Sequence, residues 1–211
     1  MPAQTIGIQP AVPQRVSLAI GNAAKRTGVP FNYLMAQARV ESSLDPDAQA
    51  SSSSAAGLFQ FTKQTWLATL SQHGPNHGLE WAADAIRKGA DGQYRIADPQ
   101  MREQILGLRF DPEISSAMAA EFADDNADML RSRFGEEPEP VDLYLAHFLG
   151  AQGASQFLSA WRADPNAPAA PMNPAPCSAA GTSRALSPPV PTPSTSMSAR
   201  SENRASWSAS T

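Results

Sequence analysis

The chain reads Val40-Glu41-Ser42-Ser43-Leu44-Asp45-Pro46 at the point where a helical pattern gives way to a loop. Before this stretch, apolar residues recur at roughly helical spacing, and Pro30 suits the start of a helix. At its end, Pro46 disfavours helical backbone in the residue that precedes it. The stretch therefore predicts a helix that carries Glu41 close to its C-terminal end.

A glutamate is unusual at that position, because the negative end of the helix dipole favours cations. A carboxyl group there favours its neutral form, and a neutral carboxylic acid is what acid-catalysed cleavage of a glycosidic bond requires. The alternative is a solvated surface glutamate without a function. Taken alone, the position of Glu41 favours this alternative. Whether Glu41 is functional therefore depends on the other motifs of the chain.

Composition excludes several classes of protein. The chain has 211 residues and a net charge of −4, and its basic residues are scattered, so we expect no nucleic-acid binding. No apolar run approaches the roughly 18 residues of a membrane span. The single cysteine, Cys177, allows neither an intrachain disulfide nor a cysteine metal cage. His73 and His77 are four residues apart, but Gly74-Pro75-Asn76 interrupts the helix that a zinc site would need.

The chain divides where its composition changes, after Asp164. Residues 165–211 are dominated by Pro, Ala and Ser and predict a disordered tail, and residues 1–11 a flexible N-terminus. Residues 12–164 predict one all-α domain. Its expected helices are a first one ending at Thr27, the Glu41 helix, and segments 63–70, 81–88, 99–108, 112–134, 141–149 and 154–161. We expect only a minimal β excursion, near residues 92–97, and a long loop over 42–61, a length that is usually functional.

Three separated segments carry the chemistry. The first is the stretch around Glu41, and the second reads Gly57-Leu58-Phe59-Gln60. The third reads Tyr144-Leu145-Ala146-His147-Phe148-Leu149-Gly150. In this order the chain resembles the soluble lytic transglycosylases, the SLT domain of glycoside hydrolase family 23, which has a lysozyme-like helical fold. The resemblance covers nearly all of the predicted domain.

The resemblance implies roles for individual residues. Glu41 matches the catalytic acid, and Ser42, Gly57, Gln60 and Tyr144 match positions that contact or shape the substrate site. Gln60 is expected to line the glycan cleft, and the hydroxyl of Tyr144 to point toward the catalytic carboxylate. The third motif is longer than the common form and lacks its asparagine, so the resemblance assigns no role to His147 or Phe148. No metal or organic cofactor is implied.

The number of catalytic carboxylates distinguishes hydrolysis of the glycan from formation of an anhydro sugar. Hydrolysis in a lysozyme-like site usually needs a second carboxylate about 5 to 9 Å from the acid. Asp45 and Asp47 are the candidates, but an aspartate before Pro46 is more simply a turn residue. The resemblance implies instead that Glu41 acts first as acid and then as base, and leaves 1,6-anhydro-N-acetylmuramic acid ends. The alternatives are a hydrolytic muramidase and a non-catalytic peptidoglycan-binding scaffold module.

Other residues are expected to serve structure only. Trp66, Trp161, Met118 and Met129 lie in apolar stripes and predict core positions. The acidic group Asp124, Asp125 and Asp128 predicts a solvated helix face.

The expected partner is the glycan strand of peptidoglycan, in the periplasm or cell envelope, bound by a monomer. Residues 1–13 lack the basic start and continuous apolar core of a signal peptide. Export by a flagellar or secretion apparatus, with the Pro/Ser-rich tail as a docking segment, is one interpretation. The other interpretation is that Met1 is not the natural start and that a signal peptide precedes it.

Overall fold

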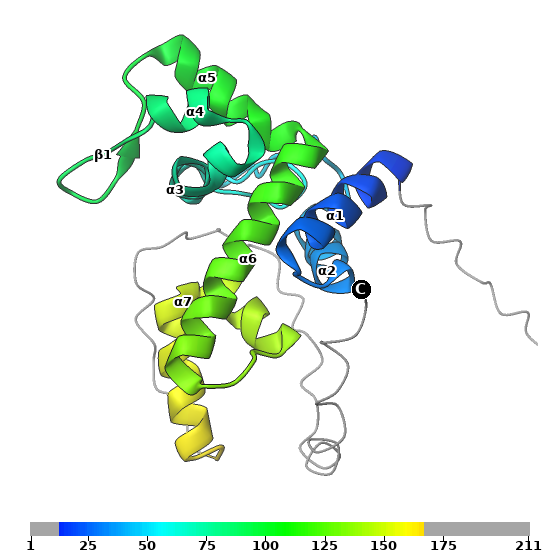
Figure 1. Cartoon of the computed structure of the whole chain (residues 1–211), viewed down its shortest axis with the longest axis vertical. Coiled ribbons are helices and arrows are strands. Elements are labelled where there is room, and N and C mark those ends of the chain that lie inside the picture. Colours follow the sequence, from blue (N-terminus) through cyan, green and yellow to red (C-terminus); the bar gives the residue numbers. More distant parts are fainter. Residues whose placement is uncertain (1–12, 167–211) are drawn as a thin grey trace, which may run out of the picture. The chain divides into compact units, whose positions relative to one another are not determined.

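The computed structural model describes residues 13–166, which form helices and one two-stranded hairpin (Figure 1). The elements are α1 (Gln14–Thr27), α2 (Phe31–Ser42), α3 (Lys63–His73), η1 (Gly74–His77), α4 (Glu80–Ala85), β1 (Arg87–Lys88), β2 (Tyr94–Arg95), α5 (Pro99–Gly107), η2 (Leu108–Phe110), α6 (Pro112–Phe134) and α7 (Pro140–Ala163). The predicted all-α class is confirmed. Apart from Pro165 and Asn166, the predicted tail and Cys177 lie outside the described residues, as does the N-terminal segment 1–11.

Helix α6 organises the domain, because α1, α2, α3 and α7 all pack against it. Its bounds agree with the prediction, since Pro112 occupies the first turn and Asp111 caps the free N–H groups of Glu113 and Ile114. Figure 1 shows α3, α4 and α5 near its N-terminal half and α7 along its C-terminal half. Met118 is fully buried, as predicted. Met129 is 50% exposed, so its predicted core position is wrong: the buried stripe passes through its neighbour Leu130 instead.

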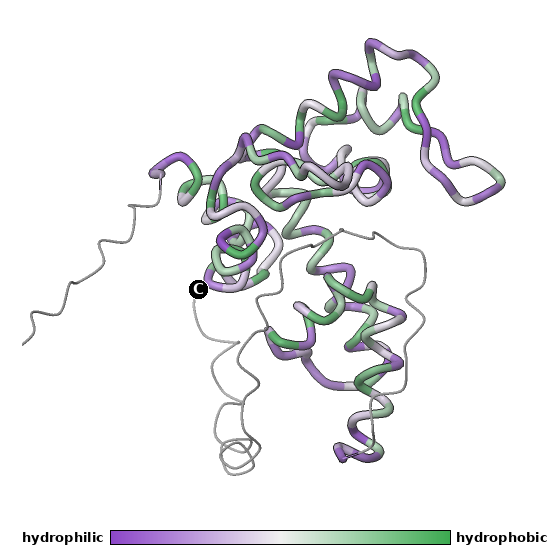
Figure 2. The backbone as a smooth tube through the Cα atoms, turned by 180° about the vertical axis from the view of Figure 1, so that it is seen from behind, coloured by the Kyte–Doolittle hydropathy of each residue, from purple (hydrophilic) through white to green (hydrophobic). Residues whose placement is uncertain are grey.

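Helix α1 ends and helix α3 begins where the sequence predicts, while α3 continues to His73, past the predicted end at residue 70. Gly28 closes α1 in the left-handed conformation, at φ 81°, and the hydroxyl of Thr62 accepts from the Thr65 N–H at the start of α3. Figure 2 shows hydrophobic and hydrophilic residues alternating at short intervals along the helices, as amphipathic packing requires. Trp66 is fully buried and its indole N–H donates to the Ile105 carbonyl, which confirms its predicted place in the core.

The segment predicted as a helix over 81–88 ends early. Helix α4 stops at Ala85, and Ile86 is extended and buried. Arg87–Lys88 then pair antiparallel with Tyr94–Arg95, inside the predicted β excursion. The hairpin gives Lys88 a position over the Tyr94 ring, 5.4 Å from its centroid.

Helix α7 is broken between the two segments that the sequence predicts as separate helices, 141–149 and 154–161. Gly150, at φ 72° and ψ 155°, interrupts it at the last residue of the third motif, in a conformation that is open essentially to glycine alone. Trp161 is 43% exposed, so its predicted core position is wrong. Figure 1 shows that the C-terminal end of α7 runs past the end of α6, and from there Arg162 reaches back over the Phe134 ring.

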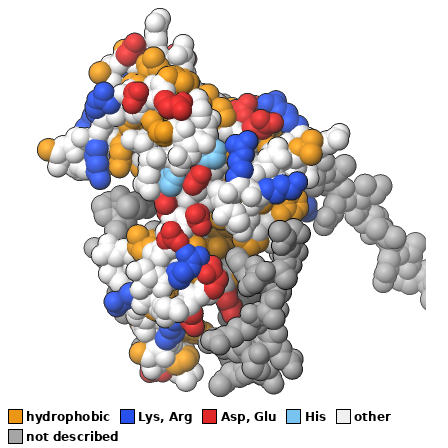
Figure 3. All heavy atoms as spheres, in the orientation of Figure 1, with side chains coloured by type: hydrophobic (Ala, Val, Ile, Leu, Met, Phe, Trp, Pro, Cys, Tyr) orange, Lys and Arg blue, Asp and Glu red, His pale blue; other side chains and the backbone are white. Residues whose placement is uncertain are grey.

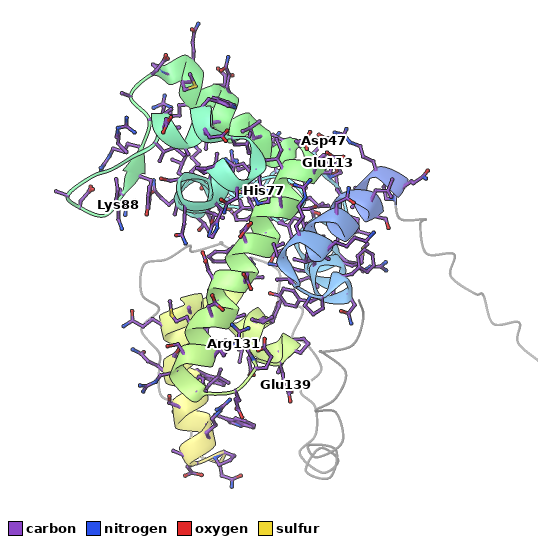
Figure 4. All side chains as sticks on the ribbon, viewed as in Figure 1. Asp47, His77, Lys88, Glu113, Arg131 and Glu139 are labelled. Atoms are coloured by element: carbon purple, nitrogen blue, oxygen red, sulfur yellow. The ribbon has the colours of Figure 1, made fainter. Side chains whose placement is uncertain are left out.

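Two histidines tie α3 and η1 to the acidic part of α6. His73 contacts Glu121 through Nδ1 (3.1 Å) and Asp125 through Nε2 (2.8 Å), while His77 Nε2 lies 2.7 Å from the other oxygen of Glu121. Figure 3 shows acidic side chains and histidine side by side on this face, and Figure 4 places His77 beside α6. Asp125 therefore anchors a histidine, so the acidic group is not simply the solvated face that the sequence predicted. None of the described helices is long and apolar enough to span a membrane.

Candidate active site

The site begins with a stripe of three polar side chains along α2. Tyr33, Gln37 and Glu41 are spaced four residues apart, which places them one above another on the same helix face. Tyr33 and Gln37 are buried, whereas the side chain of Glu41 keeps 23% exposure. The stripe therefore runs from the core outward and ends at a carboxylate that solvent can reach.

Helix α7 supplies the partner of this stripe. His147 Nε2 lies 3.1 Å from Glu41 Oε1, and the Gln37 side-chain amide Nε2 donates to His147 Nδ1 over 3.0 Å. The imidazole also meets the ring of Phe122 from α6 edge-on, with centroids 6.2 Å apart. Three helices thus fix the position of the ring that contacts Glu41.

Two tyrosines complete the surroundings of the carboxylate. Burial raises the pKa of the Tyr33 phenol far above its ordinary value, and the charges of Glu41 and then of Tyr144 raise it further. Tyr33 therefore stays a neutral phenol. Glu41 and Tyr144 therefore both lie close enough to Tyr33 to act on its phenol electrostatically. Tyr144 is 41% exposed, while its direct contact with the carboxylate stays a prediction.

The end of α2 turns sharply immediately after the carboxylate. Ser43 and Leu44 are both left-handed, at φ 57° and 69°, and the N–H groups of both bond back to carbonyls of α2. Such conformations are uncommon for residues other than glycine, and for a bulky leucine they signal strain. Leu44 is nevertheless buried in the core, which holds the turn in place.

Ser42 joins the helix end to the second motif. Its hydroxyl lies 2.8 Å from the Leu58 carbonyl and 3.1 Å from the Ala38 carbonyl, and it donates to this pair of acceptors. Ser42, which the resemblance matches to the substrate site, therefore also fixes the loop against α2.

The loop over 42–61 is irregular but tightly bonded. Gly57 donates its N–H to the Ala48 carbonyl, and the isolated bridges Gln49–Ala56 and Ala56–Phe61 fold the segment on itself. The amide of Gln60 donates to the carbonyls of Ala48 and Gly57 at 3.2 and 2.9 Å. Gln60 is half-buried, so its amide nitrogen braces the loop, and its contact with glycan stays a prediction.

The loop is clamped from outside by Arg109 of η2. The buried guanidinium donates to the carbonyls of Ser54 and Phe61, at 2.7 and 3.1 Å, and to Leu106 of α5. Burial lowers the pKa of this guanidinium, but arginine still stays protonated. Nothing in its sequence neighbourhood marked Arg109 as part of the site.

The two further carboxylates belong to the turn after α2. Asp45 Oδ1 accepts from the Asp47 N–H at 3.0 Å, the local bond of an Asx turn, and both residues are exposed. The turn interpretation of Asp45 thus has direct structural support.

Three residues of the site were missed or left without a role by the sequence: Tyr33, Gln37 and His147. The spacing of Tyr33, Gln37 and Glu41 was a usable signal, because polar residues four apart share a helix face. Among the described residues, no group of three or more His, Cys, Asp or Glu side chains is arranged to hold a metal ion.

The first part of the site lies inside a match to a known protein family. Residues 19–85 match the family model described as Transglycosylase SLT domain. The matched segment contains Glu41, the loop and its Gly57–Gln60 motif, and it ends before the α7 residues Tyr144 and His147.

Proposed function

We propose that this chain, whose residues 19–85 match the transglycosylase SLT domain model, cleaves the glycan strands of peptidoglycan with Glu41 as its acid and base. Activity of lytic transglycosylase type on peptidoglycan follows from the family in general. The bond, the product and the catalytic residue are the finer parts of the proposal. The bond is the β-1,4 linkage from N-acetylmuramic acid to N-acetylglucosamine.

One carboxyl group completes the proposed cycle. Glu41 in its acid form gives its proton to the linking oxygen as the bond from that oxygen to C1 breaks. The acetamido group of the substrate assists this departure. The Glu41 carboxylate then takes the proton of the muramic C6 hydroxyl, whose oxygen closes on C1 to form the 1,6-anhydro ring. The enzyme ends in its starting state, and no water is consumed.

The observation that carries the proposal is the placement of Glu41. Its carboxylate is partly exposed and hydrogen-bonded to a histidine that α6 and α7 hold in place. The nearest candidates in the sequence for a second catalytic carboxylate, Asp45 and Asp47, take part in an exposed turn of their own. This arrangement supports a mechanism with one carboxylate over hydrolysis with two.

The first test concerns catalysis itself. Glu41→Gln keeps the size of the side chain and removes its proton chemistry, so clearance of turbid purified sacculi should stop. Asp45→Asn and Asp47→Asn are the matched controls and should clear sacculi as the wild type does. Clearance by Glu41→Gln at the wild-type rate would contradict the catalytic role of Glu41. No clearance by the wild type itself would favour a non-catalytic binding module, and loss of activity in Asp45→Asn would favour a muramidase with two carboxylates.

We also propose where the enzyme acts. SLT domains act on peptidoglycan in the cell envelope. Residues 165–211, rich in Pro, Ala and Ser, are proposed as the docking segment for an export or flagellar apparatus. Fractionation of cells that carry the complete gene, with and without these residues, should find the full-length protein in the envelope and the shortened one depleted there. Equal amounts of the two proteins in the envelope would contradict the docking role.

A further inference from the structure

The hydrogen bonds of Gln37, His147 and Glu41 form a chain with a fixed direction. The amide nitrogen of Gln37 can only donate, so His147 Nδ1, at 3.0 Å, must accept. A neutral imidazole that accepts at Nδ1 carries its proton on Nε2. Nε2–H therefore donates to Glu41 Oε1 over 3.1 Å.

This direction makes the two oxygens of Glu41 unequal. Oε1 accepts the hydrogen bond of the His147 Nε2–H, and a proton on Oε1 would face that N–H. The acid form of Glu41 therefore carries its proton on Oε2. We propose that Gln37 and His147 are positioning residues that reserve Oε1 for the protein and leave Oε2 to make both proton transfers to and from the glycan. The inference rests on the function proposed above for Glu41.

The buried end of the chain gives independent support. Gln37 is only 5% exposed, and its Oε1 has no hydrogen-bond partner among the described residues. A buried acceptor without a partner is unfavourable for stability, and an apolar side chain of similar size avoids that cost. At this position glutamine therefore stabilises the fold less than leucine would, while its N–H groups fix the tautomer of His147.

The charges around Glu41 set the expected pH effect. The titratable groups that face it are Tyr33 on its own helix and Tyr144 and His147 on α7, and Phe122 of α6 is apolar. Since burial keeps Tyr33 neutral, the N–H of His147 is the donor that favours the ionised carboxylate. Because this hydrogen bond is lost in a variant without the imidazole, we expect the alkaline limb of kcat/KM to move to higher pH.

The test compares four variants on purified sacculi. His147→Leu removes the donor to Oε1, and His147→Gln offers an amide N–H near the position of Nε2. Gln37→Leu removes only the donor to the ring. Gln156→Leu, at an exposed glutamine further along α7, is the matched control. Each variant is measured for kcat, KM, the pH dependence of kcat/KM and the melting temperature.

We expect His147→Leu to lower kcat roughly 10- to 100-fold, in line with loss of a hydrogen bond to a charged group, with little change in KM. Its alkaline limb should move to higher pH, and His147→Gln should restore both kcat and the limb. Gln37→Leu should lower kcat about 3- to 10-fold and at the same time raise the melting temperature. Gln156→Leu should match the wild type.

Two results would overturn the inference. One is a wild-type pH profile in an active, folded His147→Leu variant. The other is a Gln37→Leu variant that loses kcat and melting temperature in parallel, as a purely structural role requires. Glu41→Gln is assayed beside these variants. If Glu41→Gln keeps its activity, the proposed function fails. If Glu41→Gln is inactive but either of the two results above is found, only the positioning role fails. Imidazole nitrogen NMR adds a direct readout, since neutral His147 should carry its proton on Nε2, and a proton on Nδ1 would contradict the proposal.

Discussion

Gly57 lies so close to Arg109 that a Cβ atom at position 57 would stand 1.9 Å from the Arg109 carbonyl oxygen. The guanidinium of the same arginine donates to the loop carbonyls of Ser54 and Phe61. The side chain of Arg109 thus holds the loop, and the backbone carbonyl of Arg109 sets how closely the loop can approach η2. The glycine of the second motif is required by this contact as well as by its φ of 79°.

Gly57→Ala should therefore displace the loop. Both the positive φ and the clash with backbone oppose alanine there, so we expect unfolding free energy to fall by about 3 kcal/mol or more and clearance of sacculi to be lost. Gly78→Ala is the matched control, because Gly78 has a similar φ of 73° but open space around its Cβ. It should lose only about 1 kcal/mol and keep its activity. Equal losses in the two variants, by chemical denaturation, would show that the approach of Arg109 is unimportant.

Ser42→Ala should loosen the joint between α2 and the loop. The variant leaves the buried carbonyl of Leu58 without its donor, so a loss of roughly 0.5 to 1.5 kcal/mol in unfolding free energy is expected. The turnover number should fall as well, since the helix end carries Glu41. Ser42→Thr keeps the hydroxyl and should recover most of both quantities. If alanine and threonine behave alike, the hydroxyl does not make this joint.

Asp124→Asn should raise stability at neutral pH. Burial, followed by the charges of Asp128 and Glu121, raises the pKa of Asp124. A raised carboxyl pKa means that folding opposes ionisation, so the penalty is present at neutral pH and absent below the ordinary aspartate pKa of about 3.9. The melting temperature of Asp124→Asn should therefore exceed that of the wild type at neutral pH, and the difference should vanish in acid.

The matched control for this prediction is Asp128→Asn. Asp128 is exposed and pairs with Arg131 on the same helix. It should show no gain at neutral pH. A gain of equal size there would mean that general relief of negative charge, and not the burial of Asp124, explains the effect.

Local signals in the sequence were sufficient for most of the fold. Pro112 and Asp111 before an apolar stripe, and Gly28 after one, specify helix ends through backbone hydrogen bonding alone, and the structure places the ends there. Trp161 was predicted wrongly because periodicity reveals which side of a helix is apolar, but not where its partner helix ends. The prediction for Met129 failed for a related reason, since the adjacent residues Met129 and Leu130 of α6 cannot both face the core.

The site was predictable only in part. Glu41 and the glycine of the second motif stand out through local backbone chemistry. The contact of Glu41 with His147 joins residues 106 positions apart, and the Arg109 clamp joins separate elements across the domain. Such pairs depend on tertiary packing, which no local pattern encodes. Gln37 was predictable in part, because the sequence shows its spacing from Glu41 but not its contact with His147.

The central claim is that Glu41 closes an anhydro ring without consuming water. Its most direct test is mass spectrometry of the soluble products released from sacculi, before and after treatment with borohydride. We predict muramic ends that are lighter by one water than hydrolysis products and that borohydride leaves unchanged. Products with reducing ends, which borohydride converts to the alditol, would contradict the account and identify the enzyme as a muramidase.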